Sequence, residues 1–226
     1  MQGFDVAQLL LTISVVAIPG IFAITMHEVA HGWAAKKLGD PTAFMLGRLS
    51  LNPLKHVDPI GTVAVPLAML WLTHGASAFG WAKPVPVAFR NLRNAKRDMI
   101  LVAAAGPGAN LAMATAWTLL AMLVGAVLAD SSLLSAWLLS VCTFGIQINI
   151  LLMVFNLVPI PPLDGGRVLS GLLPRAGSDV LDRIEPFGII IVLVLMLPPV
   201  GVLWRVIEPF VRFFVDFFLA AAGLLY

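Results

Sequence analysis

The chain has 226 residues, of which 60% are hydrophobic and only 12% are charged. A soluble domain carries about 25% charged residues, so this excess of apolar surface excludes a single water-soluble core and predicts an integral membrane protein. The formal net charge of +2 and the lone Cys142 give no basic patch for nucleic acid and exclude an intrachain disulfide.

The first uncharged stretch, residues 6–26, is long enough to cross a bilayer as a helix, which takes about 20 apolar residues. No positively charged segment precedes it, so we expect a retained helix and not a cleaved signal. The helix is expected to continue to Leu38. Lys36 and Lys37 would then lie in its last turn, and Gly39 would end it.

The motif His27-Glu28-Val29-Ala30-His31 lies at the inner end of this stretch. Side chains four residues apart share one face of a helix, so His27 and His31 can bind one metal ion. Glu28 is then placed to act on a water molecule, as in zinc peptidases. The alternative is a pair of structural histidines, but three ionisable groups beside lipid would all need partners.

Two shorter segments follow. Residues 59–72 are apolar but interrupted by Gly61 and Pro66, a length that suits a re-entrant or obliquely buried segment. In residues 80–87, two prolines forbid a helix and favour an edge strand or an irregular loop. With residues 48–51 this segment could form a small sheet whose edge captures an extended peptide, although a plain surface connector fits equally well.

Residues 99–129 and 133–155 are predicted to cross outward and back, joined by a turn at residues 130–132. Asn110 falls inside the outward crossing, in the segment Gly106-Pro107-Gly108-Ala109-Asn110, and is expected to form a hydrogen bond between helices. Beyond Pro186, residues 187–203 can span the bilayer and residues 210–225 can barely do so.

These elements predict an all-α membrane protein, a polytopic bundle of about five to six transmembrane helices with a small re-entrant or membrane-surface β element. We expect one integral-membrane domain over residues 1–226, with a catalytic core in residues 1–175 and C-terminal helices in residues 176–226. Nine of the fourteen Lys and Arg residues fall between Lys36 and Arg97. The positive-inside rule therefore predicts a multi-pass protein of the plasma membrane with its active site toward the cytoplasm.

A catalytic zinc usually has three protein ligands, and Asp164 is the best candidate for the third. It follows a proline-broken loop at the inward end of the returning helix, and Gly165 and Gly166 are expected to let the backbone turn sharply beside it. Other acidic residues and histidines are weaker candidates. We expect solvated roles for His56 and Asp58, an interfacial position for His74, and a surface helix cap at Asp182 and Glu185.

The His27-Glu28-x-x-His31 motif, the Gly106-Pro107-x-x-Asn110 segment and the motif Asn156-x-x-Pro159-x-Pro161-x-Leu163-Asp164-Gly165 together resemble the site-2 protease family of intramembrane zinc metalloproteases, peptidase family M50. The resemblance extends to about Leu173 and favours the compact branch without a PDZ or CBS domain. It implies a bundle around one buried Zn²⁺ with His27, His31 and Asp164 as ligands. It also implies that Glu28 is the catalytic base and that Asn156 holds substrate or the oxyanion.

The implied reaction is cleavage of membrane-protein substrates within the lipid bilayer. Zinc would activate a water molecule and Glu28 would take its proton. The substrate helix must first unwind locally, because a helix hides its own carbonyl groups in hydrogen bonds. One alternative is a membrane metal-ion transporter with the His/Asp cluster as a transit site. Another is a silent relative that only binds membrane partners. The sequence assigns no oligomeric state.

Overall fold

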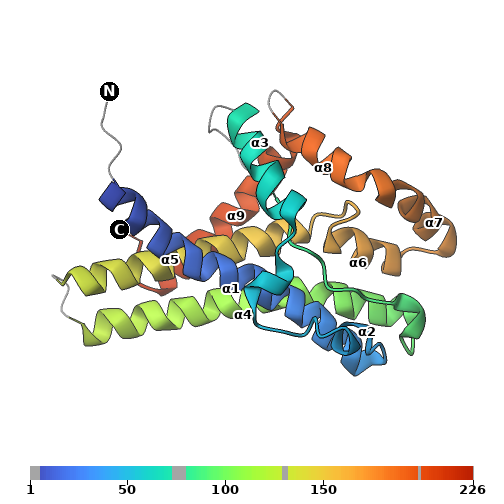
Figure 1. Ribbon diagram of the computed structural model, residues 1–226, viewed down its shortest axis with the longest axis horizontal. Coiled ribbons are helices and arrows are strands. Elements are labelled where there is room, and N and C mark those ends of the chain that lie inside the picture. The colour runs from blue at the N-terminus through green and yellow to red at the C-terminus, as the bar shows by residue number, and fades with distance from the viewer. Residues whose placement is uncertain (1–5, 73–79, 129–131, 198–199, 226) are drawn as a thin grey trace.

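The computed structural model describes residues 6–72, 80–128, 132–197 and 200–225, and its regular elements in these ranges are all helices (Figure 1). Three long apolar helices form the body of the molecule: α1 (Val6–Leu38), α4 (Ala95–Val127) and α5 (Leu133–Asn156). Each has the length and the composition to cross a membrane. Even α5, with 24 residues, is about 36 Å long, which exceeds the roughly 30 Å of bilayer hydrocarbon.

Local sequence sets the ends of these helices. As expected, α1 ends at Leu38, where Gly39 takes a φ of 114° that favours glycine. Helix α4 begins four residues earlier than hydropathy predicted, because the side chain of Asn94 caps it by accepting from the N–H of Arg97. The side chain of Ser132 caps α5 in the same way.

The remaining helices surround this body. Helix α4 packs against both α1 and α5, and α9 (Val202–Ala221) packs against both α5 and α4. The core between them contains the fully buried Ile146 and Ile150, together with Val192 of α8 (Gly188–Met196) and residues of α9. The shorter elements are α2 (Thr42–Met45), a 3₁₀ helix (Pro53–His56), a π-helical turn (Pro59–Ala64), α3 (Val65–Leu72), a second 3₁₀ helix (Phe89–Asn91), α6 (Asp164–Leu172), α7 (Arg175–Ile184) and a third 3₁₀ helix (Glu185–Phe187).

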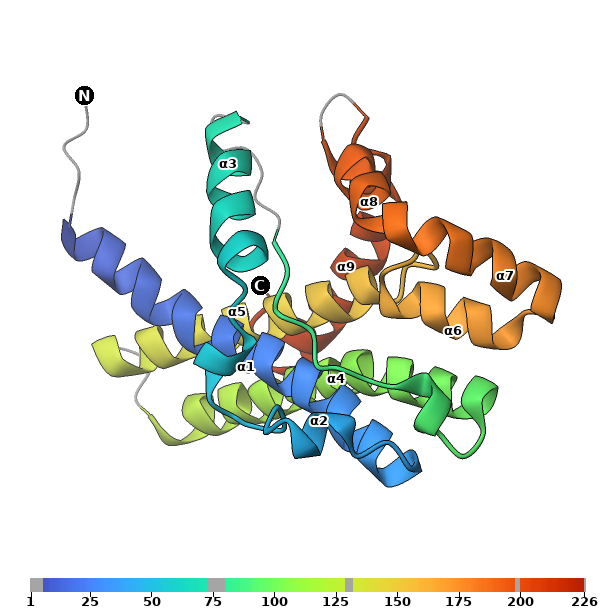
Figure 2. The ribbon, with the colours of Figure 1, turned by 45° about the vertical axis from the view of Figure 1, so that its right-hand side comes forward.

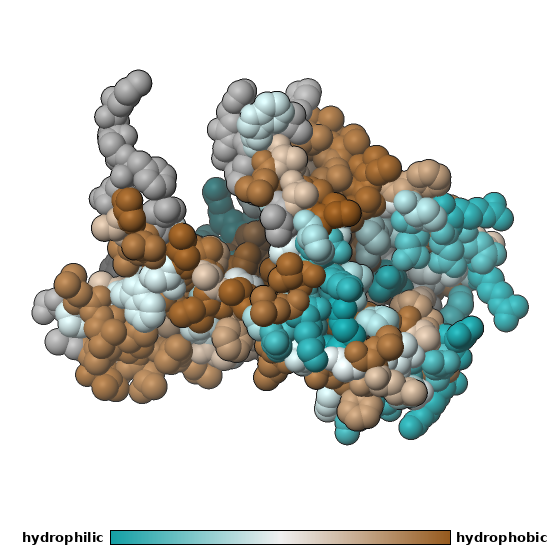
Figure 3. Space-filling view, in the orientation of Figure 1, coloured by the Kyte–Doolittle hydropathy of each residue, from teal (hydrophilic) through white to brown (hydrophobic). Residues whose placement is uncertain are grey.

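The surface divides along the length of the molecule. In Figure 3, hydrophobic residues cover the end where α4 and α5 meet, and hydrophilic residues gather at the opposite end, over α2, α6 and α7. This division follows the sequence, since the cluster of basic residues lies around the end of α1 and the start of α4. An apolar body with one polar end is the surface expected of an integral membrane protein.

Among the described residues, three helices meet the length and composition of a membrane span. Helices α3 and α8 have only eight and nine residues, which is too short for a helix to cross alone. Figure 2 shows α3 standing clear of the long helices. Helix α9 has 20 residues, but four charged side chains interrupt its apolar character: Arg205, Glu208, Arg212 and Asp216.

The predicted small sheet is not formed in the described part of the chain. Residues 80–88 are extended, as the prolines required, but they make no strand ladder with residues 48–51. Pro84 and Pro86 have no N–H group to donate along one edge of the segment, which prevents pairing there. Arg48 links the two segments instead, through a hydrogen bond from its Nη2 to the carbonyl oxygen of Pro84 at 3.4 Å.

Asp40 fastens the extended segment to the end of α1. Its buried carboxylate accepts hydrogen bonds from the N–H of Ala88 at 2.7 Å and from Nδ2 of Asn91 at 2.9 Å. The N–H and the hydroxyl of Thr42 also donate to it. Burial alone would raise the pKa of the Asp40 carboxyl, but these hydrogen bonds favour the charged form and hold the pKa below its usual range.

Replacing Asp40 with Asn tests this anchor. The pKa of Asp40 is lower in the folded protein than in the unfolded chain. Its carboxylate therefore stabilises the fold in full above the ordinary pKa of about 4, and this stabilisation is lost as the pH falls below that value. We expect Asp40→Asn to lower the free energy of unfolding by about 1–3 kcal/mol at neutral pH. The melting temperatures of Asp40→Asn and of the wild-type protein, measured in detergent, should differ at pH 7 and converge below pH 4. Asp182→Asn, at an exposed position, serves as the control. A difference in melting temperature between Asp40→Asn and wild type that did not change with pH would refute the assignment to the charge of Asp40.

Candidate metal centre

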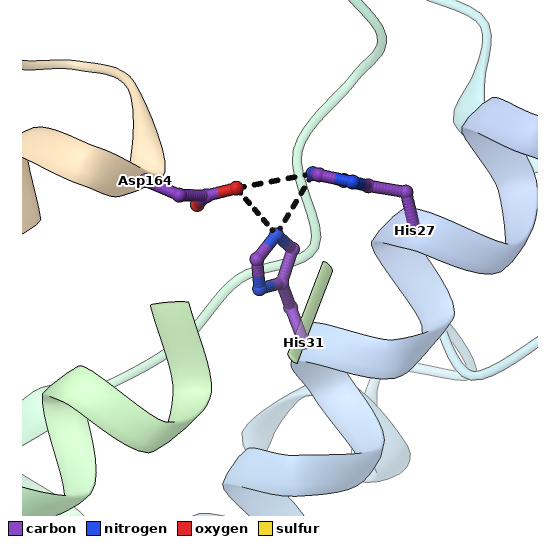
Figure 4. A group of neighbouring side chains, drawn as sticks. All are labelled: His27, His31 and Asp164. Atoms are coloured by element: carbon purple, nitrogen blue, oxygen red, sulfur yellow. Dashed lines mark hydrogen bonds and ion pairs between the residues drawn. The ribbon is translucent and has the colours of Figure 1, made fainter. Parts of the chain in front are cut away.

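The structure brings together the three residues that the sequence singled out as metal ligands (Figure 4). His27 and His31 extend from consecutive turns of α1, and Asp164 is the first residue of α6. The Nε2 atoms of the two histidines are 3.0 Å apart. Oδ2 of Asp164 lies 3.2 Å from Nε2 of His27 and 3.3 Å from Nε2 of His31.

This donor set fits a zinc ion. Zinc–nitrogen and zinc–oxygen bonds of about 2.0–2.1 Å in a tetrahedron put neighbouring donor atoms about 3.3 Å apart, close to the separations found here. Oδ2 of Asp164 is buried, and no hydrogen bond from the described residues reaches it. A carboxylate oxygen left without a hydrogen bond beside two imidazole nitrogens is the kind of donor that a metal ion binds.

The other nitrogen of each imidazole is fixed by a hydrogen bond. Nδ1 of His31 lies 2.7 Å from the carbonyl oxygen of Val102, and Nδ1 of His27 lies 2.6 Å from Oδ1 of Asn110. Because both partners are acceptors, each Nδ1 donates, which leaves a lone pair on each Nε2 directed at the shared centre. The expectation that Asn110 forms a hydrogen bond between helices is confirmed.

The centre requires glycine on the neighbouring helix. Gly106 of α4 lies so close to α1 that a Cβ atom there would overlap with Nε2 of His31 and would be 2.6 Å from Cε1 of His27. Only hydrogen fits in this space. The glycine-containing segment that the sequence marked for close helix contact is therefore the place where α4 touches the two imidazoles.

Gly165 and Gly166 serve a different purpose from the expected sharp turn. Both lie inside α6, and neither has a positive φ. Instead, a Cβ atom on Gly165 would overlap with the carbonyl oxygen of Leu157, and one on Gly166 would overlap with the backbone nitrogen of Pro161. These glycines let the start of α6 pack directly against the proline-rich loop before it, which fixes the position of Asp164.

Glu28 and Asn156 line a cleft of about 630 Å³ that also contains the three converging side chains. Oε2 of Glu28 accepts a hydrogen bond from the N–H of Val85 in the extended segment, at 2.7 Å. Nδ2 of Asn156 donates to the carbonyl oxygen of Leu152 at 2.9 Å. Both residues therefore face the cleft from the expected elements, and neither belongs to the cluster of metal donors.

The prediction of a solvated His56 is wrong. Its side chain is only 3% exposed and lines the same cleft. Nε2 of His56 lies 2.9 Å from the carbonyl oxygen of Ser50, and the N–H of Lys83 donates to the main-chain oxygen of His56. These contacts with Ser50 and with the extended segment bury the side chain, and its hydrophilic sequence neighbours gave no sign of them.

The other weaker candidates lie away from the centre. Asp58 caps the π-helical turn by accepting from the N–H groups of Ile60 and Gly61. Glu185 forms an ion pair with Arg167, at 3.4 Å. Asp182 is exposed on α7. His74 lies outside the described residues.

Substitution of Gly106 tests the close approach of α4. We expect Gly106→Ala to displace the imidazoles and to abolish stoichiometric zinc binding, measured by elemental analysis of the purified protein. Gly108→Ala is the matched control, because it adds the same methyl group to the same helix in open space. Its better helix propensity, worth about 1 kcal/mol, should leave zinc content unchanged. Full zinc content in Gly106→Ala would contradict the observed packing.

Comparison with known proteins identifies the family of this chain. The family model of Peptidase family M50 matches residues 120–198, which include Asp164 but not the histidine pair. YwhC of Bacillus subtilis, named as a candidate zinc metalloprotease, is 39% identical over 193 residues, and the match covers 83% of each chain.

Two mycobacterial relatives carry the same kind of name. Rip2 of Mycolicibacterium smegmatis is 29% identical over 179 residues, covering 79% of this chain and 65% of the relative. Rip3 of Mycobacterium tuberculosis is 30% identical over 159 residues, covering 70% of this chain and 30% of the relative. No solved structure matches the chain. With a 39% identical relative covered over 83% of its length, the chain belongs to peptidase family M50, the site-2 protease family of zinc metalloproteases.

Proposed function

We propose that this protein is an intramembrane zinc metalloprotease that hydrolyses peptide bonds in or near the transmembrane segments of other membrane proteins. The observation that carries this proposal is the convergence of His27, His31 and Asp164 within 3.3 Å of one another. The two histidines belong to α1, which is long and apolar enough to span a bilayer. These three residues are the proposed ligands of one Zn²⁺ per chain. Family membership points to the same metal.

Glu28 is the proposed general base. Zinc, when bound, supplies a Lewis acid that makes a water molecule acidic near neutral pH. Glu28 follows directly after His27 and faces the same cleft, so its carboxylate can accept the proton of the attacking water and later deliver it to the leaving amine. The N–H of Val85 holds Oε2 at 2.7 Å, which orients the carboxylate and leaves Oε1 for the proton.

Asn156 is the proposed donor for the developing oxyanion. It ends α5, across the proline-rich loop from Asp164, and it lines the cleft. A side-chain amide has two N–H groups, and the carbonyl oxygen of Leu152 uses one of them. The second is available to a substrate carbonyl oxygen as it gains negative charge.

The walls of the cleft suit a substrate that comes from the bilayer. Apolar side chains from four helices line it beside the metal centre: Ile21, Ile24, Val102, Leu152 and Ile189. A substrate helix hides its carbonyl groups in its own hydrogen bonds, so the segment that enters this cleft must be locally unwound. The proposed partners are therefore the lipid bilayer and a membrane protein with a helix-breaking sequence at the cleavage site.

We further propose a multi-pass topology in the plasma membrane with the active site toward the cytoplasm. Support comes from the polar end of the molecule (Figure 3) and from the distribution of basic residues, nine of which fall within residues 36–97, between the end of α1 and the start of α4. In this proposal the chain is one integral-membrane domain, with residues 1–175 as catalytic core and residues 176–226 as C-terminal helices. The proposed bundle has about five to six crossings in total. Those beyond α1, α4 and α5 would come from the C-terminal helices, and residues 59–72 would be re-entrant.

The alternative, a metal-ion transporter, has no support from the family or from the names of the relatives. A transport path also needs polar groups free to bind the moving ion. The buried amides of Asn110 and Asn149 instead bind each other, and Asn110 also binds His27.

Replacement of Glu28 by Gln separates catalysis from metal binding. We expect Glu28→Gln to keep one zinc per chain and to lower the rate of cleavage of a membrane substrate by about a hundredfold to ten-thousandfold, because the amide cannot accept the proton. Zinc content and cleavage of a reconstituted substrate are measured on the same preparation. Glu208→Gln, on the outer helix α9, is the control. Cleavage by Glu28→Gln at the wild-type rate would disprove the general-base role.

Replacement of Asp164 by Ala tests the third ligand. We expect Asp164→Ala to lose both zinc and cleavage, since two imidazoles alone bind zinc weakly at a site built for three donors. The isosteric Asp164→Asn should bind zinc more weakly than wild type, since it loses the negative charge. Retention of full zinc content by both variants would remove Asp164 from the ligand set and with it the proposed centre.

A further inference from the structure

Asn149 lies in the middle of α5 and is fully buried, and its side-chain hydrogen bonds go to Asn110 and Gly145 and not to the proposed zinc ligands. We infer that Asn149 and Asn110 form an amide relay, from α5 through α4 to α1, that fixes which nitrogen of His27 carries the proton. In this view Asn149 is a positioning residue of the metal centre. The inference rests on the proposed function, because it assumes that His27 binds the metal through Nε2.

The relay begins at a main-chain carbonyl of α5. Nδ2 of Asn149 donates to the carbonyl oxygen of Gly145, one turn earlier in the same helix, at 2.8 Å. A carbonyl oxygen can only accept, so the nitrogen of the amide must face Gly145. Oδ1 of Asn149 must therefore face the opposite way, toward α4.

The second amide is oriented by two acceptors. Nδ2 of Asn110 donates to Oδ1 of Asn149 at 2.9 Å and to the carbonyl oxygen of Ala23 in α1 at 3.2 Å. Both of its N–H groups are used by oxygen atoms that cannot donate. If the amide were turned over, its own oxygen would face these two oxygens inside a fully buried site, at the cost of two hydrogen bonds and an electrostatic repulsion.

The relay ends at His27. With Asn110 held in this orientation, its Oδ1 lies 2.6 Å from Nδ1 of His27 and can only accept. Nδ1 must therefore carry the proton, and the lone pair of the ring is on Nε2, the atom that faces His31 and Asp164. His31 needs no relay, because the carbonyl oxygen of Val102 fixes its Nδ1 directly.

The position of the two amides in long apolar helices supports a functional reason for them. Asn110 and Asn149 are each fully buried, within α4 and α5. Polar side chains are costly inside a membrane-spanning bundle, and two apolar residues of similar size would satisfy packing alone. An apolar side chain forms no hydrogen bonds, so it could not link the orientation of Asn149 in one helix to the protonated nitrogen of His27 in another.

The test compares two substitutions on the same helix that make the same chemical change. Asn149→Leu removes the start of the relay, and Gln147→Leu removes an exposed amide two residues away. Zinc affinity of the full-length protein in detergent is measured by competition with a chelator. We expect affinity to fall about 10- to 100-fold in Asn149→Leu, to fall at least as much in Asn110→Leu, and to stay at the wild-type value in Gln147→Leu.

A second measurement on the wild-type protein needs no variant to fold. In ¹⁵N-histidine spectra of the zinc-loaded protein, His27 should show a proton on Nδ1 and none on Nε2. A proton on Nε2 would overturn the relay, as would wild-type zinc affinity in a folded Asn149→Leu. If the wild-type protein bound no zinc at all, the proposed function itself would fail, so the two failures are distinguishable.

Discussion

Three Lewis-basic side chains held within 3.3 Å of one another, inside an apolar bundle, are the constraint on which the rest of this structure depends. Without a cation, the lone pairs of two imidazoles and a carboxylate would repel one another where little water screens them. Holding them together requires α4 to touch α1, which is possible because Gly106 has no side chain. It also requires α6 to begin directly against its own preceding loop, which Gly165 and Gly166 allow. The glycines are therefore as necessary to this arrangement as the three converging side chains.

The extended segment connects this centre to the polar end of the molecule. The N–H of Val85 in this segment donates a hydrogen bond to the carboxylate of Glu28. Three residues later, the N–H of Ala88 donates to the carboxylate of Asp40. Both carboxylates belong to α1 or directly follow it. The segment is thus attached along the helix that carries His27 and His31, and it forms one wall of the cleft beside Glu28. Its prolines keep it from becoming a strand that would pair with other chains.

Polar groups in the long helices are few, and the structure accounts for several of the buried ones in physical terms. Asn110 and Asn149 form a continuous hydrogen-bonded path to His27, and the buried hydroxyl of Thr118 is satisfied within its own helix by the carbonyl oxygen of Ala114. The chain thus uses two ways of placing polar atoms in an apolar bundle. A hydroxyl group donates to a carbonyl oxygen of its own helix. An amide has donors and an acceptor on opposite sides and can therefore link three helices.

Local properties of the sequence determined the three long helices, the end of α1 at Leu38 and the face shared by His27 and His31, because hydropathy, helix period and capping act within a few residues. The family resemblance also came from the sequence, and the relatives confirm it. The structure places Asp164 beside both imidazoles, and its role as a metal ligand stays a prediction. Only the tertiary structure decided the burial of His56, the packing role of Gly165 and Gly166, the missing sheet and the link from Asn149 to His27. Each of these depends on how folded segments pack against one another, either across a loop or between helices, and neither local pattern nor composition carries that information.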